Sequence, residues 1–341
     1  MIYQFNNGTF KGEVDAENRM SSGEFVFNNG DRFVGEWKDN KFYKGTLYRA
    51  SGSIYEGTFK NGLKHGKGTF WLPSGAKYEG EYKNGHRHGK GTFWFSDGRR
   101  YEGKWVDDKI MGKGTLFSKS GSRLIGKWDG EELVGKGVCF RSAGGKYTGT
   151  FLERKYHGKG KLKFSNGNVY KGEFFKGEMQ GYGVMKYADG RVYKGEWKNS
   201  NWHGFGTLRL KDGGKYVGNY NKGEAQGKGR IVFANGDKYD GTFKNSVADG
   251  NGKIIYANGE RYEGEFKNNT PNGKGTYWYK SGGVYNGEIV NGLPCGKGVL
   301  YYGDGHMYEG ELKDGLRHGY GKYTTPTDVW EGEWANDKFI K

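Results

Sequence analysis

One 23-residue unit, with the pattern Tyr-x-Gly-x-aromatic followed by Gly-x-Gly, recurs from near the first residue of this chain to near the last. Of the fourteen spacings between successive opening residues, twelve are 23 residues and two are 22. The units open at Phe10, Phe33, Tyr55, Tyr78, Tyr101, Leu124, Tyr147, Tyr170, Tyr193, Tyr216, Tyr239, Tyr262, Tyr285, Tyr308 and Trp330. Because no catalytic domain fits between units packed this tightly, the function has to be sought on the surface of a repeat array.

Composition agrees with a repeat architecture. Glycine accounts for 66 of 341 residues and only 33% of residues are hydrophobic, which is too little aliphatic side chain for one large core. The aromatic residues recur periodically, which argues against disorder. In a repeat protein each unit buries surface against its neighbours alone. We therefore expect residues 1–341 to form a single continuous array of about 14 full units and a C-terminal half unit.

One unit is expected to build one β-hairpin. In residues 78–83 the rings of Tyr78 and Tyr82 share one face of a strand, whereas the carboxylates of Glu79 and Glu81 share the other. The Asn84-Gly85 pair that follows supplies the positive φ angles of a tight turn. Residues 89–95 are then expected to return as a regular strand, and Ser96-Asp97-Gly98 to turn into the next unit. The fold class is thus all-β, an elongated, single-layer, twisted antiparallel sheet of stacked hairpins.

The strand glycines have a packing explanation. A ring such as Trp105 or Trp197 is too large to lie beside another full side chain at strand spacing. A neighbouring glycine opens the slot for the ring, and the ring covers the bare backbone. Repeated in every unit, this packing stabilises hairpins that are marginal alone.

The two ends of the array depart from the pattern. We expect residues 1–54 to be atypical N-terminal capping units and 308–341 to be an atypical C-terminal cap or dimerisation edge. The strand that contains Trp330 and Trp334 is expected to have no partner in its own chain. Two interpretations are open, a charged solvated cap or a dimerisation edge that forms a homodimer, and we favour the second.

The sequence Tyr-Glu-Gly-Glu-Tyr-Lys-Asn-Gly-His-Arg-His-Gly-Lys-Gly-Thr-Phe, which begins at Tyr78, resembles the MORN repeat (membrane occupation and recognition nexus). The resemblance covers residues 10–341 and is poorest in the units that open at Phe10, Leu124 and Tyr239. In some members of that family the repeats accompany kinases or membrane anchors. Chains that are nearly all MORN are similar to cytoskeletal scaffolds or ciliary components, and this chain resembles that group.

A lysine recurs inside the Gly-x-Gly segment, at Lys67, Lys90, Lys113, Lys136 and Lys159 in five consecutive units. A glutamate usually stands three residues after the opening aromatic, but in this stretch Thr58, Lys104, Lys127 and Thr150 mostly replace it. By strand parity these lysines and glutamates should share a face. Residues 55–160 are therefore expected to present a basic stripe without its usual counter-charges.

Aromatic residues follow four positions after these lysines, at Trp71, Trp94, Phe117 and Phe140. Basic groups beside rings can bind an anionic headgroup, an acidic polypeptide tail or single-stranded nucleic acid. The alternative is that the rings close a second hydrophobic layer and the lysines keep the surface soluble. The net charge of +16, concentrated in the first half of the chain, fits an acidic partner but also fits simple solubility.

Site chemistry beyond binding is not expected. Five histidines occupy a repeat position that other units fill with Met, Gln, Asp, Asn or Cys, and a metal site does not tolerate such mixing. The Gly-x-Gly segments lie in expected strands with no following helix, so they are not a dinucleotide fingerprint. We expect no catalytic residue, no metal and no cofactor.

Our first hypothesis is a non-enzymatic, rod-like scaffold that binds proteins in a cytoskeletal or ciliary (axonemal) assembly. The alternative is a peripheral membrane tether that binds anionic phosphoinositides through the basic stripe. Nucleic acid ranks third, since the charge is spread along a long surface. Scarce thiols and the lack of a leader or an apolar 18-residue stretch predict a cytoplasmic protein at the cytoskeleton, cilium or membrane periphery, neither secreted nor membrane-spanning.

Overall fold

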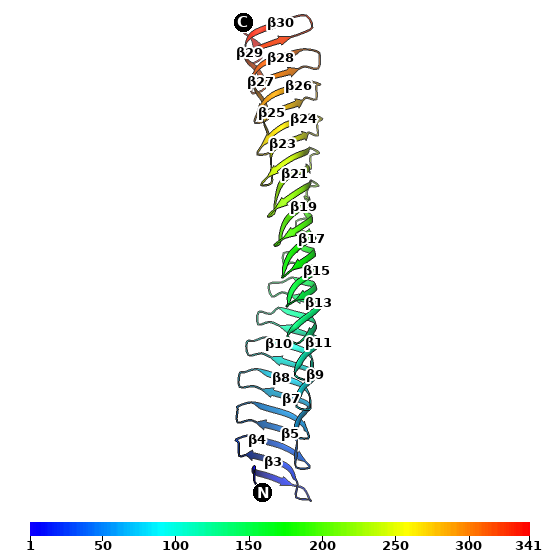
Figure 1. The fold of residues 1–341 in the computed structure, drawn as a ribbon, viewed down its shortest axis with the longest axis vertical. Helices are drawn as coiled ribbons and strands as arrows, with labels where there is room; N and C mark the ends of the chain where they lie inside the picture. Colours follow the sequence, from blue (N-terminus) through cyan, green and yellow to red (C-terminus); the bar gives the residue numbers. More distant parts are fainter. The chain divides into compact units, whose positions relative to one another are not determined.

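The computed structural model describes residues 1–341 and consists of β-strands, turns and bends without a helix. The chain divides into a first unit, Met1–Ser165 with Phe174–Gly177, and a second unit, Asn166–Glu173 with Glu178–Lys341. Within each unit, strands that follow one another in sequence pair antiparallel, hairpin after hairpin (Figure 1). The expectation of an all-β antiparallel hairpin sheet is confirmed.

The strands that belong to the first unit are β1 (Ile2–Phe5), β2 (Gly8–Val14), β3 (Met20–Phe27), β4 (Arg32–Lys38), β5 (Lys41–Tyr48), β6 (Ile54–Lys60), β7 (Leu63–Trp71), β8 (Lys77–Lys83), β9 (His86–Trp94), β10 (Arg100–Val106), β11 (Lys109–Phe117), β12 (Arg123–Asp129), β13 (Glu132–Phe140), β14 (Lys146–Leu152) and β15 (Lys155–Lys163). The boundary between the units falls within β16 (Val169–Phe175). The strands of the second unit are β17 (Glu178–Lys186), β18 (Val192–Lys198), β19 (Asn201–Arg209), β20 (Lys215–Asn221), β21 (Glu224–Val232), β22 (Lys238–Lys244), β23 (Val247–Ile255), β24 (Arg261–Lys267), β25 (Thr270–Trp278), β26 (Val284–Val290), β27 (Leu293–Tyr301), β28 (Met307–Lys313), β29 (Leu316–Thr324), β30 (Val329–Ala335) and β31 (Lys338–Phe339).

The hairpin β8–β9 shows how the sequence sets the register. Tyr78 lies opposite Phe93, and the chain reverses at Asn84 and Gly85, whose φ angles are 50° and 88°. Two successive positive φ angles define the tight turn whose twist matches that of the strands, and Asn-Gly adopts it at little cost. The predicted turn is therefore confirmed.

The returning strand differs from the expected regular strand beginning at residue 89. Strand β9 starts at His86, and a bulge interrupts its pairing with β8 where Gly89 and Lys90 have no partner. Gly89 has φ +63°, a conformation that residues with a Cβ rarely adopt. The alternation expected for this strand holds in its pairing with β10, where residues 89–94 match β10 without a shift, but the bulge against β8 was not predicted.

The strand glycines lie against aromatic rings, but the nearest rings are those of the opening tyrosines and not Trp105 or Trp197, which the sequence suggested. We call the face that carries Tyr78 and Tyr82 the inner face and the opposite face the outer face. Tyr78 is fully buried, and a Cβ added to Gly91 would lie 2.5 Å from two carbons of its ring and closer still to its hydroxyl oxygen. The Tyr78 hydroxyl donates to the Glu81 carbonyl at 3.0 Å. The glycines opposite one another in the strands, such as Gly80 and Gly91, therefore make room for a ring that seals the inner face.

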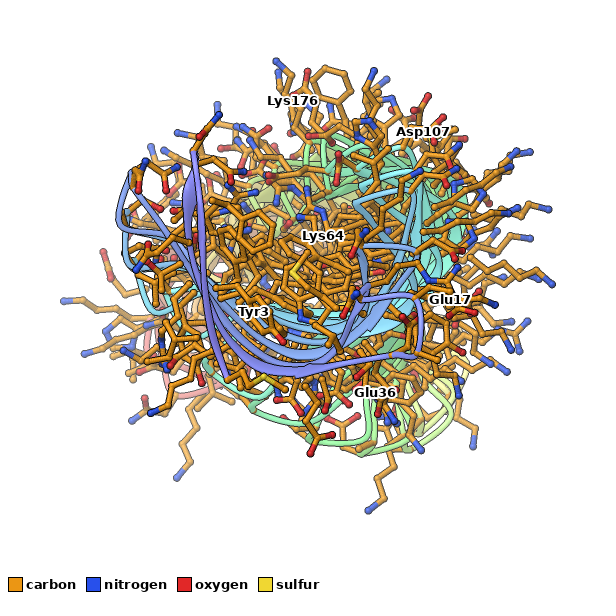
Figure 2. All side chains as sticks on the ribbon, turned by 90° about the horizontal axis from the view of Figure 1, so that it is seen from below. Tyr3, Glu17, Glu36, Lys64, Asp107 and Lys176 are labelled. Carbon is orange, nitrogen blue, oxygen red and sulfur yellow. The ribbon has the colours of Figure 1, made fainter.

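The strands curve around this aromatic core. Figure 2 shows Tyr3 and Lys64 inside the curve of the first strands and Glu36 outside it. The Lys64 ammonium lies 4.4 Å from the Phe70 ring centre and 5.1 Å from that of Tyr82, and burial lowers its pKa. The polar residues with free access to solvent are consequently those of the outer face and the turns.

The C-terminal strand does not remain unpaired. β31 pairs with the end of β30, with Trp334 opposite Phe339, and the Glu333 N–H donates to the Lys341 carbonyl at 2.9 Å. The expectation that this strand lacks a partner in its own chain was therefore wrong. Trp334 is 5% exposed and packs inward, whereas Trp330 is 39% exposed. Dimerisation at this edge stays a prediction, with Trp330 as its accessible ring.

Candidate functional site

Side chains on the outer face of the first unit form columns that run from strand to strand. The columns arise because hairpins of equal length repeat in equal register. From β6 to β14 the lysine column contains Thr58, Lys67, Glu81, Lys90, Lys104, Lys113, Lys127, Lys136 and Thr150. The middle column contains Glu56, Thr69, Glu79, Thr92, Glu102, Thr115, Ile125, Val138 and Thr148. The aromatic column contains Ile54, Trp71, Lys77, Trp94, Arg100, Phe117, Arg123, Phe140 and Lys146.

The lysine column includes the basic stripe expected from sequence. Lys67 lies opposite Glu81, which places the lysine and glutamate positions on one face as strand parity predicted. The next pairs along the column are like-charged, with Lys90 opposite Lys104 and Lys113 opposite Lys127. All of these lysines are exposed. Like charges directly opposite one another destabilise a strand pair, so an anion at this place would relieve a local cost.

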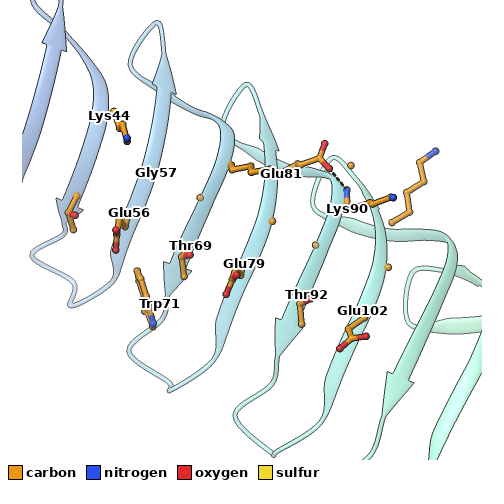
Figure 3. A pocket seen from close by; sticks show the side chains of 18 of the residues that line it. Lys44, Glu56, Gly57, Thr69, Trp71, Glu79, Glu81, Lys90, Thr92 and Glu102 are labelled. Atoms are coloured by element: carbon orange, nitrogen blue, oxygen red, sulfur yellow. Dashed lines mark hydrogen bonds between the residues drawn. The ribbon is translucent and has the colours of Figure 1, made fainter.

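A shallow groove runs between the lysine and middle columns over a floor of glycine backbone. Its first part has a cavity volume of about 1670 Å³ and spans β5 to β11 (Figure 3). In Figure 3, Glu56, Thr69, Glu79, Thr92 and Glu102 follow one another on successive strands, and Glu81 reaches the backbone of Lys90. A second part of about 670 Å³ continues over β11 to β14. The residues lining this second part include Lys113, Lys127 and Lys136 but no carboxylate.

The aromatic column contacts cations other than the predicted lysines. Lys77 lies between two tryptophans, with its ammonium 5.8 Å from the Trp71 ring centre and 4.7 Å from that of Trp94. The Arg100 guanidinium lies 4.3 Å from the Phe117 ring centre. Sequence reasoning missed these cations, although the signal was present: a basic residue directly precedes several opening aromatics and has the same parity as the rings.

The last of the predicted rings, Phe140, is also contacted by cations other than the predicted lysines. The Phe140 ring is contacted by Arg123 at 4.2 Å and by Lys146 at 5.1 Å. Two carboxylates of the middle column also pair with this column, Glu79 with Lys77 at 3.0 Å and Glu102 with Arg100 at 2.9 Å. The half-buried rings are thus covered by their own cations, and the predicted lysines face the groove instead.

The predicted stripe is not uniform along its length. Trp71, Lys67, Lys90 and Lys113 line the first part of the groove, whereas Lys136 lines the second. Lys159 on β15 is exposed and lines neither part. The outer face can therefore hold an extended polar chain over a backbone floor. Its cations lie on one side and, over β6 to β10, its carboxylates lie on the other.

The fold and this surface define a class of protein, the open antiparallel repeat sheet that offers an exposed, periodic face to other molecules. The chain belongs to the MORN repeat family. The family model matches eleven segments: 55–77, 78–99, 101–123, 147–169, 170–190, 193–215, 216–238, 239–261, 262–284, 285–307 and 308–328. The unit that opens at Leu124 and those before Tyr55 are not matched, whereas the Tyr239 unit is matched.

Similarity to solved structures is weak. One is the TCP domain of SAS-4 (dCPAP) of Drosophila melanogaster in complex with a proline-rich motif of Ana2 (dSTIL), at 13% identity and a TM-score of 0.30, covering 52% of this chain and 90% of that chain. Another is the wild-type TCP10 domain of Danio rerio CPAP, at 14% identity and a TM-score of 0.22, covering 64% and 94%. A search of curated proteins found no match. The structure contains no helix that is long and apolar enough to cross a membrane.

Proposed function

We propose that the protein is a non-enzymatic scaffold that binds protein partners in a cytoskeletal or ciliary (axonemal) assembly. The observation that carries this proposal is the groove on the outer face of the first unit, where side chains repeat in register over β5 to β14. Successive strands lie about 4.8 Å apart, so equivalent contacts recur about every 9.6 Å, once per hairpin. A linear partner can engage several hairpins at once, which is the binding mode of repeat proteins.

The chemistry of the outer face supports binding rather than catalysis. Three carboxylates of the groove are engaged: Glu79 pairs with Lys77, Glu102 pairs with Arg100, and Glu81 accepts the backbone N–H of Lys90. General acid–base work requires a titrating group directed at a reacting atom, and these carboxylates are directed at their own strands. The cytoskeletal setting is proposed from the resemblance to chains composed almost wholly of this repeat.

A second candidate is a peripheral tether on membranes that contain anionic phosphoinositides. The observation that favours it is the pair of like-charged contacts, Lys90 with Lys104 and Lys113 with Lys127. Ammonium groups gathered without counter-charges attract phosphorylated headgroups, and this attraction weakens steeply with ionic strength.

Extraction of native cells separates the two candidates. Cells are treated with non-ionic detergent, the pellet is washed with salt at about 0.5 M, and the protein is followed by immunoblot. Retention in the insoluble pellet through both steps supports the scaffold, because aromatic burial and strand contacts resist salt. Release by detergent alone contradicts the scaffold and favours the tether. Vesicles with and without a phosphoinositide then test the tether directly.

A further inference from the structure

In three hairpins the glutamate at the position of Glu81 accepts a hydrogen bond from the backbone at the bulge. At the bulge of β8–β9, Glu81 Oε1 accepts the Lys90 N–H at 3.1 Å. In the second unit, Glu196 Oε1 accepts the Phe205 N–H at 3.2 Å and Glu265 Oε1 accepts the Lys274 N–H at 3.3 Å. In these three hairpins the chain therefore supplies one carboxylate oxygen of its own to a backbone donor at the bulge.

Two consecutive bulged hairpins of the first unit have a lysine in place of this glutamate. In β10–β11 and in β12–β13 the position is occupied by Lys104 and Lys127. An ammonium group has three donors and no acceptor, so neither lysine can replace glutamate at the bulge. The N–H groups of Lys113 and Lys136, which correspond to that of Lys90, accordingly have no side-chain acceptor.

The same substitution changes the charge opposite each neighbouring lysine. Lys67, Lys274 and Lys297 lie opposite glutamates, namely Glu81, Glu288 and Glu311. By contrast, Lys104 lies opposite Lys90, and Lys127 lies opposite Lys113. We call Lys90, Lys104, Lys113, Lys127 and Lys136 the lysine cluster. None of its members forms an ion pair, and Lys113, Lys127 and Lys136 line the same part of the groove on the outer face.

We propose that the lysine cluster binds an extended acidic polypeptide segment, whose carboxylates take the places of the two missing glutamates. This inference rests on the proposed scaffold function and names the chemistry of one partner. The acceptor that the bulge uses elsewhere in the chain is a side-chain carboxylate, and a glutamate or aspartate of a partner supplies the same group. Over β11 to β14 the groove is lined by Thr115, Ile125 and Val138 opposite the lysines, so no carboxylate repels the segment there. Beside Lys104, the Glu102 carboxylate is already paired with Arg100 at 2.9 Å.

The spacing of the two bulges fits a polypeptide. They lie two strands apart, which is about 9.6 Å at the usual strand separation. In a polyproline II conformation, residues i and i+3 point to the same side and lie about 9.3 Å apart, so two carboxylates in that relation reach both bulges. From Lys90 on β9 to Lys136 on β13 the cluster spans about 19 Å, the length of about six extended residues.

The test measures binding of a fluorescein-labelled deca-glutamate peptide to the full chain by fluorescence anisotropy at physiological salt. The variant Lys104→Glu/Lys127→Glu restores glutamate at both bulges. We expect its affinity for the peptide to fall about tenfold or more, while its melting temperature stays equal or rises, because each like-charged pair becomes an opposite-charged pair. A loss of binding without a loss of stability excludes misfolding as the cause.

The matched control is Lys198→Glu/Lys244→Glu, which changes the net charge equally at exposed strand ends of β18 and β22 in the second unit. Its affinity for the peptide is expected to stay within about twofold of the unchanged chain. Equal loss in both variants, or no loss in the cluster variant, overturns the inference. The inference is also overturned if the chain does not bind the peptide but binds phosphoinositide vesicles through the lysine cluster, because the cluster would then be a lipid site. The extraction experiment tests the scaffold function separately, since retention in the pellet does not depend on this peptide.

Discussion

Replacing Gly91 with alanine tests the packing on which the fold depends. Gly91 does not require a positive φ, so the backbone itself admits alanine. The new Cβ would stand 2.5 Å from two carbons of the Tyr78 ring and closer still to its hydroxyl oxygen, well inside van der Waals contact. Because Tyr78 is fully buried, its ring has no free volume to enter.

The magnitude follows from two contributions. Overpacking of a well-filled core costs about 1–3 kcal/mol. Displacing the ring also breaks the hydrogen bond from Tyr78 to the Glu81 carbonyl, which contributes about 1 kcal/mol. We therefore expect Gly91→Ala to lower the free energy of local opening of β8–β9 by about 2–4 kcal/mol, or about 30-fold or more in amide exchange rate.

The assay is native-state hydrogen exchange of β8–β9, because unfolding of a long repeat chain is not a single two-state transition. Tyr78→Ala provides the partner for a double-mutant cycle. Once the ring is removed, Gly91→Ala should cost almost nothing, since the Cβ then enters vacated space. If Gly91→Ala costs as much in the Tyr78→Ala background as in the unchanged chain, the clash with the ring is not what the glycine avoids, and the packing argument is refuted.

Three further predictions follow from the core and the turns. Trp197 is 4% exposed and its indole N–H donates to the Gly183 carbonyl at 3.3 Å. Trp197→Ala should therefore lower the free energy of opening of β18–β19, measured by amide hydrogen exchange, by about 3–5 kcal/mol. A loss under about 1 kcal/mol would contradict burial of the inner face. Burial raises the pKa of Tyr101 and Tyr262 to about 12, so these neutral phenols stabilise the folded chain fully below the unfolded pKa of about 10. The stability of the fold should therefore fall as pH rises from about 10 to about 12, which phenolate absorbance and circular dichroism measure together. Ionisation of all tyrosines near pH 10 without unfolding would argue against this reasoning. The backbone N–H of Ala50 and the Arg49 guanidinium hold the pKa of Asp31 below its usual value, so Asp31→Asn should destabilise β4–β5 at pH 7 and lose this effect as pH falls through the lowered pKa. A difference that persists after the Asp31 carboxyl has been protonated would mean that charge is not the cause.

The sequence predicted most of the hairpin. Alternation in residues 78–83, the Asn84-Gly85 turn and the pairing of rings with glycines are local properties, and a repeat displays each of them many times over. The bulge at Gly89 was missed because both glycines of Gly-x-Gly were assigned to ring packing. A glycine inside a strand pattern is also typical of a bulge, and only the structure distinguishes the two roles: Gly89 has a positive φ and Gly91 abuts a ring.

The candidate site was predicted in part. Strand parity placed Lys67, Lys90 and Lys113 on one face, because side-chain direction follows from sequence position alone. It could not show that Lys77 and Arg100 cover the aromatic rings, since this depends on which residues meet across strands. Nor could it show that Glu81 binds the backbone N–H of Lys90, because that contact exists only where the strand bulges.

The residue beside each bulge lies on the surface of its hairpin and can change without any change in the core. The residue at position 81, 104 or 127 faces outward, so exchanging glutamate for lysine there leaves every buried ring in place. In the hairpins of Glu81, Glu196 and Glu265 the glutamate accepts a backbone N–H at the bulge, whereas a lysine at this position offers no acceptor and adds a positive charge. If the lysine cluster binds an acidic segment as proposed, one outward-facing substitution per hairpin would change where along the array such a segment binds, without any change in the core.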